Sequence, residues 1–110
     1  MSEIAIPVLH VADAARALAW YARLDFEVDW EHRFAPDLPA FVSISRPGGA
    51  TLYLSEHRED ARPNTLLHLR VDSLTPIAEE FATTPVPLPW AHEIHLTDPD
   101  TNRLRISADT

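Results

Sequence analysis

The sequence predicts an α+β fold of two βαβββ repeats, forming a curved mixed sheet with a concave cleft and one helix per repeat on the outside. The first observation is the order of strand and helix signals, β-α-β-β-β followed by β-α-(β)-β-β, along 110 residues. The second is internal sequence similarity, because Val8–Asp13 resembles Leu67–Asp72 at an offset of about 60 residues. We therefore expect a single domain over 1–110, with repeats at about 1–57 and 64–110.

The first predicted repeat starts with an apolar, β-branched strand that contains Pro7. Proline lacks an amide donor, so this strand lies at an edge or beside a break. Asp13 then precedes an alanine-rich helix in the N-cap position. Alternating apolar and acidic residues in the next segment indicate a half-buried strand. The predicted strands are Ile4–Val11, Phe26–Glu31, Ala40–Arg46 and Ala50–Glu56, the helix is Ala14–Leu24, and a turn lies at Pro47-Gly48-Gly49.

The second predicted repeat repeats this order with a shorter middle section. Pro76 fits the first turn of its helix, where a missing amide donor is tolerated. The proline-rich Pro85–Pro89 cannot be a central strand, so it is an extended linker or a very short edge strand. The predicted strands are Thr65–Asp72, Glu93–Thr97 and Leu104–Ser107, the helix is near Leu74–Ala82, and a turn lies at Asp98–Asn102.

Composition excludes several classes of function. The chain has 17 acidic and 9 basic side chains and a formal charge of −8, whereas a nucleic-acid partner requires clustered basic charge. It has no cysteine, which excludes disulfides, thiolate nucleophiles and cysteine-ligated metals. We find no apolar run of about 18 residues and no secretory signal, so we expect no membrane partner and a cytoplasmic location.

Five segments together resemble the vicinal-oxygen-chelate superfamily of glyoxalase I, extradiol dioxygenases, and fosfomycin- and bleomycin-resistance proteins. Their order and spacing cover nearly the whole chain and are most similar to the bleomycin-resistance branch. Asp25 and Thr101 depart from the pattern, because the family usually has turn glycines there; for Thr101 we expect a changed turn. The segments are Ile6–Leu9, Trp20–Val28, Pro63–Thr65, Pro89–Ile94 and Asp98–Arg105.

The resemblance also implies where a metal would be bound. The catalytic branches hold a divalent metal with one His, Gln or Glu side chain from each of four strands. The matching positions here are Ile6, Tyr53, Leu66 and Arg105. Two are aliphatic, one is cationic, and a neutral phenol is a poor ligand, so we expect neither a metal nor another cofactor at the usual place.

The ligand-binding residues follow from strand parity and from the resemblance. Trp30 and Phe41 fall where bleomycin-resistance proteins line the drug groove with aromatics, and His68 falls where they carry a stacking tryptophan. Parity places Ser55 on the face of Tyr53. We expect Trp30 and Phe41 to stack on a ligand, while the same aromatics would equally fill a core or a dimer interface. The expected polar contacts come from Tyr53, Ser55 and His68, and Arg105 would meet an anionic part of the ligand.

The leading hypothesis is a metal-independent protein of the bleomycin-resistance type, without catalytic residues, that sequesters a small molecule in an aromatic cleft. The resemblance implies a homodimer. A second hypothesis is a metal-dependent lyase, isomerase or dioxygenase whose metal has moved to the neighbourhood of His10 and His68. A third is an interaction module whose cleft is vestigial.

Overall fold

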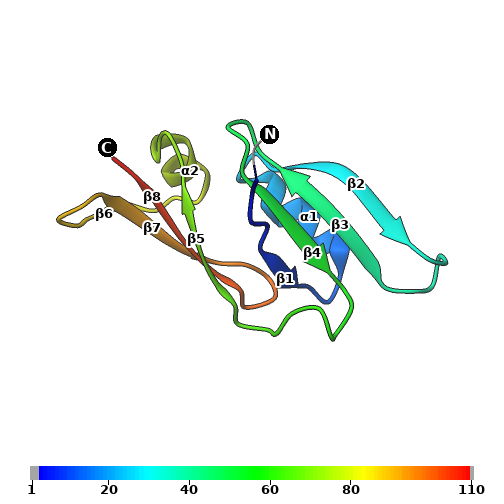
Figure 1. Ribbon diagram of the computed structural model, residues 1–110. Coiled ribbons are helices and arrows are strands. Elements are labelled where there is room, and N and C mark those ends of the chain that lie inside the picture. The colour runs from blue at the N-terminus through cyan, green and yellow to red at the C-terminus, as the bar shows by residue number, and fades with distance from the viewer. Residues whose placement is uncertain (1–2, 110) are drawn as a thin grey trace.

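The computed structural model describes residues 3–109 and contains eight strands and two helices within them (Figure 1). Their order is that of two successive βαβββ repeats, as the sequence predicted. The elements are β1 (Val8–His10), α1 (Ala14–Ala22), β2 (Glu27–Arg33), β3 (Ala40–Ser45), β4 (Thr51–Ser55), β5 (Leu66–Arg70), α2 (Thr75–Glu80), β6 (Val86–Pro87), β7 (His92–Thr97) and β8 (Arg103–Ala108).

Each repeat forms its own four-stranded mixed sheet. The strand order is β1-β4-β3-β2 in the first sheet, called sheet A, and β5-β8-β7-β6 in the second, called sheet B. In both sheets the first strand of the repeat pairs in parallel with the last, and the remaining pairs are antiparallel. The matching topologies confirm the predicted duplication and the α+β class. No helix among residues 3–109 is long and apolar enough to cross a membrane.

Helix α1 begins and packs as its sequence predicts. The side chain of Asp13 accepts hydrogen bonds from the amides of Ala15 and Arg16, which satisfies donors that a helix start leaves unpaired. Ala14, Ala17 and Tyr21 lie on the buried face at helical spacing. This face turns toward sheet A, so the opposite face of the sheet is left free of the helix.

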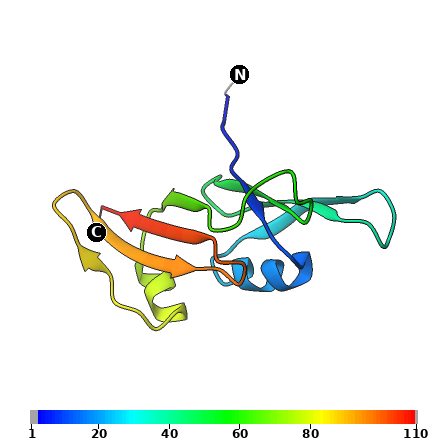
Figure 2. The same ribbon diagram turned by 90° about the horizontal axis from the view of Figure 1, so that it is seen from below.

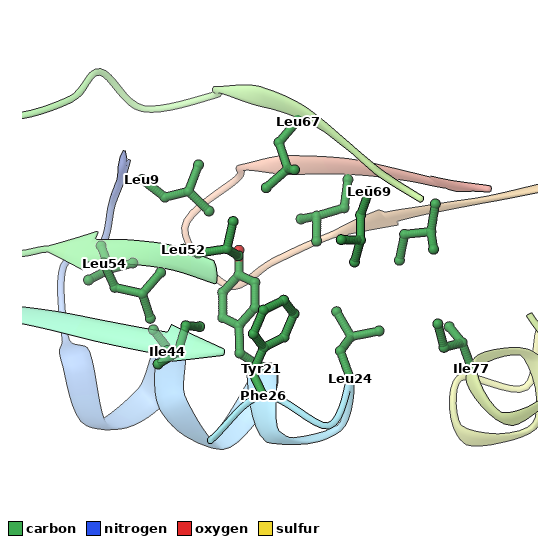
Figure 3. Close-up of a cluster of buried hydrophobic side chains, with 14 of the residues drawn as sticks. Leu9, Tyr21, Leu24, Phe26, Ile44, Leu52, Leu54, Leu67, Leu69 and Ile77 are labelled. Carbon is green, nitrogen blue, oxygen red and sulfur yellow. The ribbon is translucent and has the colours of Figure 1, made fainter. Parts of the chain in front are cut away.

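The hydrophobic core is continuous between the two repeats. In Figure 3, leucines and isoleucines from the inner faces of both sheets surround the aromatic rings of Tyr21 and Phe26. Alternate residues of each strand point inward, as the two-residue period of a strand requires. The buried residues of the core strands are Leu9, Ala40, Val42, Ile44, Leu52, Leu54, Leu67, Leu69, Ile94, Leu104, Ile106 and Ala108.

Two strands of sheet A differ from their prediction. Strand β1 starts only at Val8, and the preceding residues extend away from the sheets (Figure 2), with Ile4 70% exposed. Strand β2 was predicted to be half-buried, and this is wrong: every residue from Glu27 to His32 is exposed. The reason is that β2 is an edge strand whose register shifts between Val28 and Trp30, which interrupts the alternation.

The turns without glycine keep left-handed backbone angles. Asp25 after α1 has a φ of 66° and Thr101 in the β7–β8 turn has a φ of 69°. The changed turn expected at Thr101 is therefore not needed, because the threonine itself adopts the strained conformation. The carboxylate of Asp98 holds the turn by accepting hydrogen bonds from the amides of Asp100 and Asn102. In the same repeat, the proline-rich segment contains β6, which is a very short edge strand, one of the two predicted alternatives.

Candidate functional site

Three aromatic side chains from three adjacent strands meet on the outer face of sheet A. Trp30 of β2 stacks on Phe41 of β3, with ring centroids 6.0 Å apart and planes at 15°. Tyr53 of β4 lies 5.5 Å from Trp30 and 5.0 Å from Phe41 between ring centroids. Trp30 is 46% exposed and the other two rings are partly exposed. We call these three residues the aromatic trio; its members were all predicted as ligand-binding residues.

The irregularity in β2 adds an acidic group beside the trio. Asp29 is the extra residue between Val28 and Trp30, so it lies on the same face as the indole instead of the opposite one. Its carboxylate accepts hydrogen bonds from the hydroxyls of Ser43, at 3.0 Å, and Ser45. Asp29 was not among the predicted site residues, because strict alternation places it away from Trp30.

Ser55 lies next to this face but does not open onto it. The side chain is fully buried, and its hydroxyl donates a hydrogen bond of 2.6 Å to Asp60. The same oxygen accepts a hydrogen bond of 3.1 Å from the amide of His57. Ser55 therefore fixes the start of the loop after β4, and in a single chain its hydroxyl is already engaged on both sides.

The outer face of sheet B carries polar side chains in register. His68, Arg105 and His95 stand side by side across β5, β8 and β7. Arg105 donates hydrogen bonds from Nε at 3.0 Å and from Nη2 at 2.8 Å to one carboxylate oxygen of Glu93. The same oxygen accepts a hydrogen bond of 2.9 Å from Nε2 of His95. His68 is hydrogen-bonded to Ser107 at 2.8 Å. The two predicted residues, His68 and Arg105, are therefore neighbours on this sheet.

Glu93 is the electrostatic centre of this group and was not predicted as a site residue. Its side chain is inaccessible to solvent. Hydrogen bonds from His95 and then from Arg105 lower the pKa of Glu93 from 4.5 to about 2, although burial opposes this shift. The carboxylate is consequently ionised at neutral pH and holds the guanidinium in a fixed orientation. No pattern in the sequence indicates this pair, because its contact depends on the register of β7 with β8.

One chain thus forms two groups of candidate residues rather than one. Among residues 3–109, no hydrogen bond, ion pair or ring contact joins the aromatic trio to His68 or Arg105, and the two groups lie on different sheets. A cavity of about 330 Å³ lies on sheet B, lined in part by Leu66, Arg103 and Arg105.

The residues at the family's metal positions do not fit a metal. Tyr53 belongs to the aromatic trio, Leu66 is apolar, and Arg105 carries a positive charge. Across residues 3–109, no group of three or more His, Asp or Glu side chains is arranged to hold a metal ion. The displaced site near His10 and His68 gains no support either. His10 lines a different cavity, of about 380 Å³, at the end of sheet A.

Comparison with known proteins agrees with the fold and shows the family. A family model described as glyoxalase superfamily protein matches residues 1–109, so the chain belongs to this superfamily. No curated protein matches the sequence.

Solved structures that resemble this chain include antibiotic-binding proteins. A bleomycin-binding protein from Streptomyces verticillus, complexed with copper(II)-bleomycin, is 27% identical, with full coverage of both chains and a TM-score of 0.65. A glyoxylase/bleomycin resistance protein/dioxygenase domain from Frankia sp. EAN1pec is 23% identical, with a TM-score of 0.79 and coverage of 100% of this chain and 99% of that one. Another bleomycin-binding protein, complexed with bleomycin, is 20% identical, with a TM-score of 0.76 and coverage of 99% and 100%.

Proposed function

We propose that this chain is a cytoplasmic small-molecule-binding protein of the bleomycin-resistance type, which confers antibiotic resistance by sequestering its ligand without chemical change. The aromatic trio carries this proposal. Stacked, partly exposed rings on a sheet face provide a flat apolar surface, and such surfaces bind flat ligands by stacking and bind cations through the ring faces. The neighbouring carboxylate of Asp29 and the net charge of −8 add attraction for a ligand with a cationic part.

The proposed roles follow the two groups of residues. Trp30 and Phe41 stack on the flat part of the ligand, and Tyr53 closes the apolar surface beside them. Ser55 fixes the start of the loop after β4 through Asp60. On the other sheet, His68 supplies a polar contact and Arg105 meets an anionic part of the ligand. No step in this function requires a metal, and no covalent bond forms or breaks.

The binding unit we propose is a homodimer. The aromatic trio and Arg105 lie on separate sheets of one chain, so a second copy supplies the opposite wall of a closed cleft. A large exposed aromatic side chain outside the core supports this arrangement, since Trp90 is 67% exposed. The extended residues before Val8, with Ile4 70% exposed, are a further surface for a partner copy. Sedimentation that shows only monomer at micromolar concentration contradicts the dimer.

The test is ligand binding by matched aromatic variants. Metal-free bleomycin and a panel of flat aromatic antibiotics are screened by thermal shift, because a ligand that binds the native state raises the melting temperature. Affinity is then measured by calorimetry. Trp30→Ala and Phe41→Ala should each weaken binding at least about fivefold, since stacking contributes roughly 1–3 kcal/mol per ring. Phe34→Ala, which removes an exposed ring outside the trio, is the control and should bind as the wild type does.

Two results would contradict the proposal. Equal affinity of the Trp30→Ala, Phe41→Ala and Phe34→Ala variants would show that the trio does not contact the ligand. Stoichiometric iron, manganese, nickel or zinc in the purified protein, together with binding that is lost in chelator and restored by that metal, would favour the metal-dependent enzyme instead.

A further inference from the structure

The cavity on sheet B is built from two rows of side chains in register. Leu66, Arg103 and Thr97 form one row across β5, β8 and β7, and Arg105 with His95 forms the next. The cavity volume of about 330 Å³ lies at the lower end of the range for small-molecule sites. Leu66, which is 49% exposed, provides an apolar wall beside the two guanidinium groups. The lining therefore combines positive charge with apolar surface.

Arg105 is oriented for a second acceptor. Glu93 engages its Nε and Nη2 through a single carboxylate oxygen, and the Arg105 side chain is still 40% exposed. A guanidinium has five N–H donors, so this ion pair leaves the Nη1 donors available. Among residues 3–109, no acceptor is hydrogen-bonded to Nη1 of Arg105. The pair thus restrains the guanidinium while one edge stays free.

Arg103 makes the local charge positive. It is exposed, and no acidic side chain among residues 3–109 forms an ion pair with it. Glu93 offsets the charge of Arg105 but is itself inaccessible to solvent, so the surface that a ligand meets here is basic. This surface stands out in a chain of charge −8 that contains no lysine. Elsewhere, Arg16, Arg23, Arg33 and Arg70 are each paired with a carboxylate.

We propose that this cavity binds the carboxylate of an aromatic acid. The free edge of Arg105 and the guanidinium of Arg103 hold the two oxygens, since the planar fork of arginine matches a carboxylate. The hydroxyl of Thr97 lies in the same row, and Leu66 contacts the apolar body of the acid. The inference deepens the proposed function, on which it rests, by naming the class of group that the sequestered ligand presents to sheet B.

The experiment uses a series of small probes that differ in one group. Binding of 1-naphthoate, 1-naphthamide and 1-naphthylmethylamine is measured by calorimetry on the full chain. The acid should bind at least about tenfold more tightly than the amide, because charge-assisted hydrogen bonds are stronger than neutral ones. Arg103→Gln should lower affinity for the acid severalfold and leave affinity for the amide unchanged. Arg62→Gln, a change in the exposed loop before β5, is the matched control and should have no effect.

A substitution of Arg105 must be combined with one of Glu93, because removing the guanidinium alone leaves a buried carboxylate without its ion-pair partner. The double variant Glu93→Gln/Arg105→Gln removes both charges together and keeps a hydrogen-bonding pair. It should fold and bind the acid no more tightly than the amide. Equal affinity of wild-type protein for acid and amide overturns the inference, as does a preference for the amine or for inorganic phosphate over 1-naphthoate.

This outcome is separable from the failure of the proposed function. If bleomycin or another flat ligand binds in a manner that depends on Trp30, but the arginine variants and the naphthoate series show no effect, the carboxylate site fails and sequestration stands. If naphthoate binding depends on Arg103 while Trp30→Ala and Phe41→Ala change nothing for any ligand, the carboxylate site stands and the aromatic cleft fails.

Discussion

The hydroxyl of Tyr21 donates a hydrogen bond of 2.7 Å to Oδ2 of Asp98, which links helix α1 of the first repeat to the β7–β8 turn of the second. Both residues are buried. Burial, and then the charge of Asp98, raises the pKa of Tyr21 above its usual value of 10, so the phenol remains a proton donor at neutral pH. Asn102 reinforces the junction by donating to the carbonyl of His10 at 2.9 Å. Orientation of the two sheets therefore depends on a small polar cluster within the core.

Removing this hydroxyl should destabilise the whole fold. In Tyr21→Phe, Oδ2 of Asp98 keeps only the side-chain Nδ2 of Asn102 as a donor, so a buried carboxylate loses a charge-assisted hydrogen bond. We expect the free energy of unfolding to fall by about 2 kcal/mol. Urea denaturation at pH 7 measures it. Tyr53→Phe, which removes a hydroxyl from a partly exposed ring, should change stability by less than about 0.5 kcal/mol. Equal effects of the two variants would contradict the role of the bond.

Acid stability should depend on Glu93. Its pKa of about 2 in the folded chain lies below its usual 4.5, so the unfolded state binds more protons in this range. The stabilisation from the carboxylate is therefore complete above about pH 4.5 and is lost as the pH falls toward 2. Glu93→Gln should flatten the dependence of the melting temperature on pH across this window, whereas Glu59→Gln in an exposed loop should retain it. An unchanged slope in Glu93→Gln would refute the assignment.

The left-handed threonine offers a stabilising substitution. A β-branched residue with a φ of 69° is strained, and glycine relieves that strain at a smaller cost in chain entropy. Thr101→Gly should raise the free energy of unfolding by about 1 kcal/mol, which thermal denaturation detects as a rise of several degrees. The control is Thr97→Gly in strand β7, which should lower stability because glycine weakens strands. A loss of stability in Thr101→Gly would show that the turn is not strained.

Ser55 should affect stability and not ligand affinity. Ser55→Ala removes the hydroxyl that joins Asp60 to the amide of His57, and this part-buried amide then lacks its partner. We expect the free energy of unfolding to drop by about 1–2 kcal/mol. Thr84→Ala, at an exposed position, should change little. Affinity for any ligand that depends on Trp30 should match the wild type; a selective loss of affinity in Ser55→Ala would instead indicate direct contact.

The repeat order was predictable because it depends on local signals. The cap at Asp13 and the apolar periods of the strands are legible in the sequence alone, as is the proline that confines Val86–Pro87 to an edge. These features fix the element order and therefore the α+β class. The internal sequence similarity then indicated the duplication, which no single element reveals.

The details of the site were less predictable because they depend on register. An extra residue at Asp29 leaves the sequence pattern intact but changes the face on which Trp30 lies. The pairing of Glu93 with Arg105 requires knowledge of how β7 aligns with β8. The exposure of β2 follows from its place at the edge of sheet A, and that place is a property of the assembled sheet.

The many prolines and few glycines have a consequence for self-association through strands. Each open sheet has two edge strands, and an edge with unpaired backbone N–H and C=O groups can pair with strands of other chains. Pro7 lies directly before β1 and Pro87 lies within β6, so a residue without an amide donor stands at two of the four edges. At a third edge, β2 is irregular and carries acidic residues. These features at three of the four edges should lower the tendency of the chain to aggregate through its strands at high protein concentration.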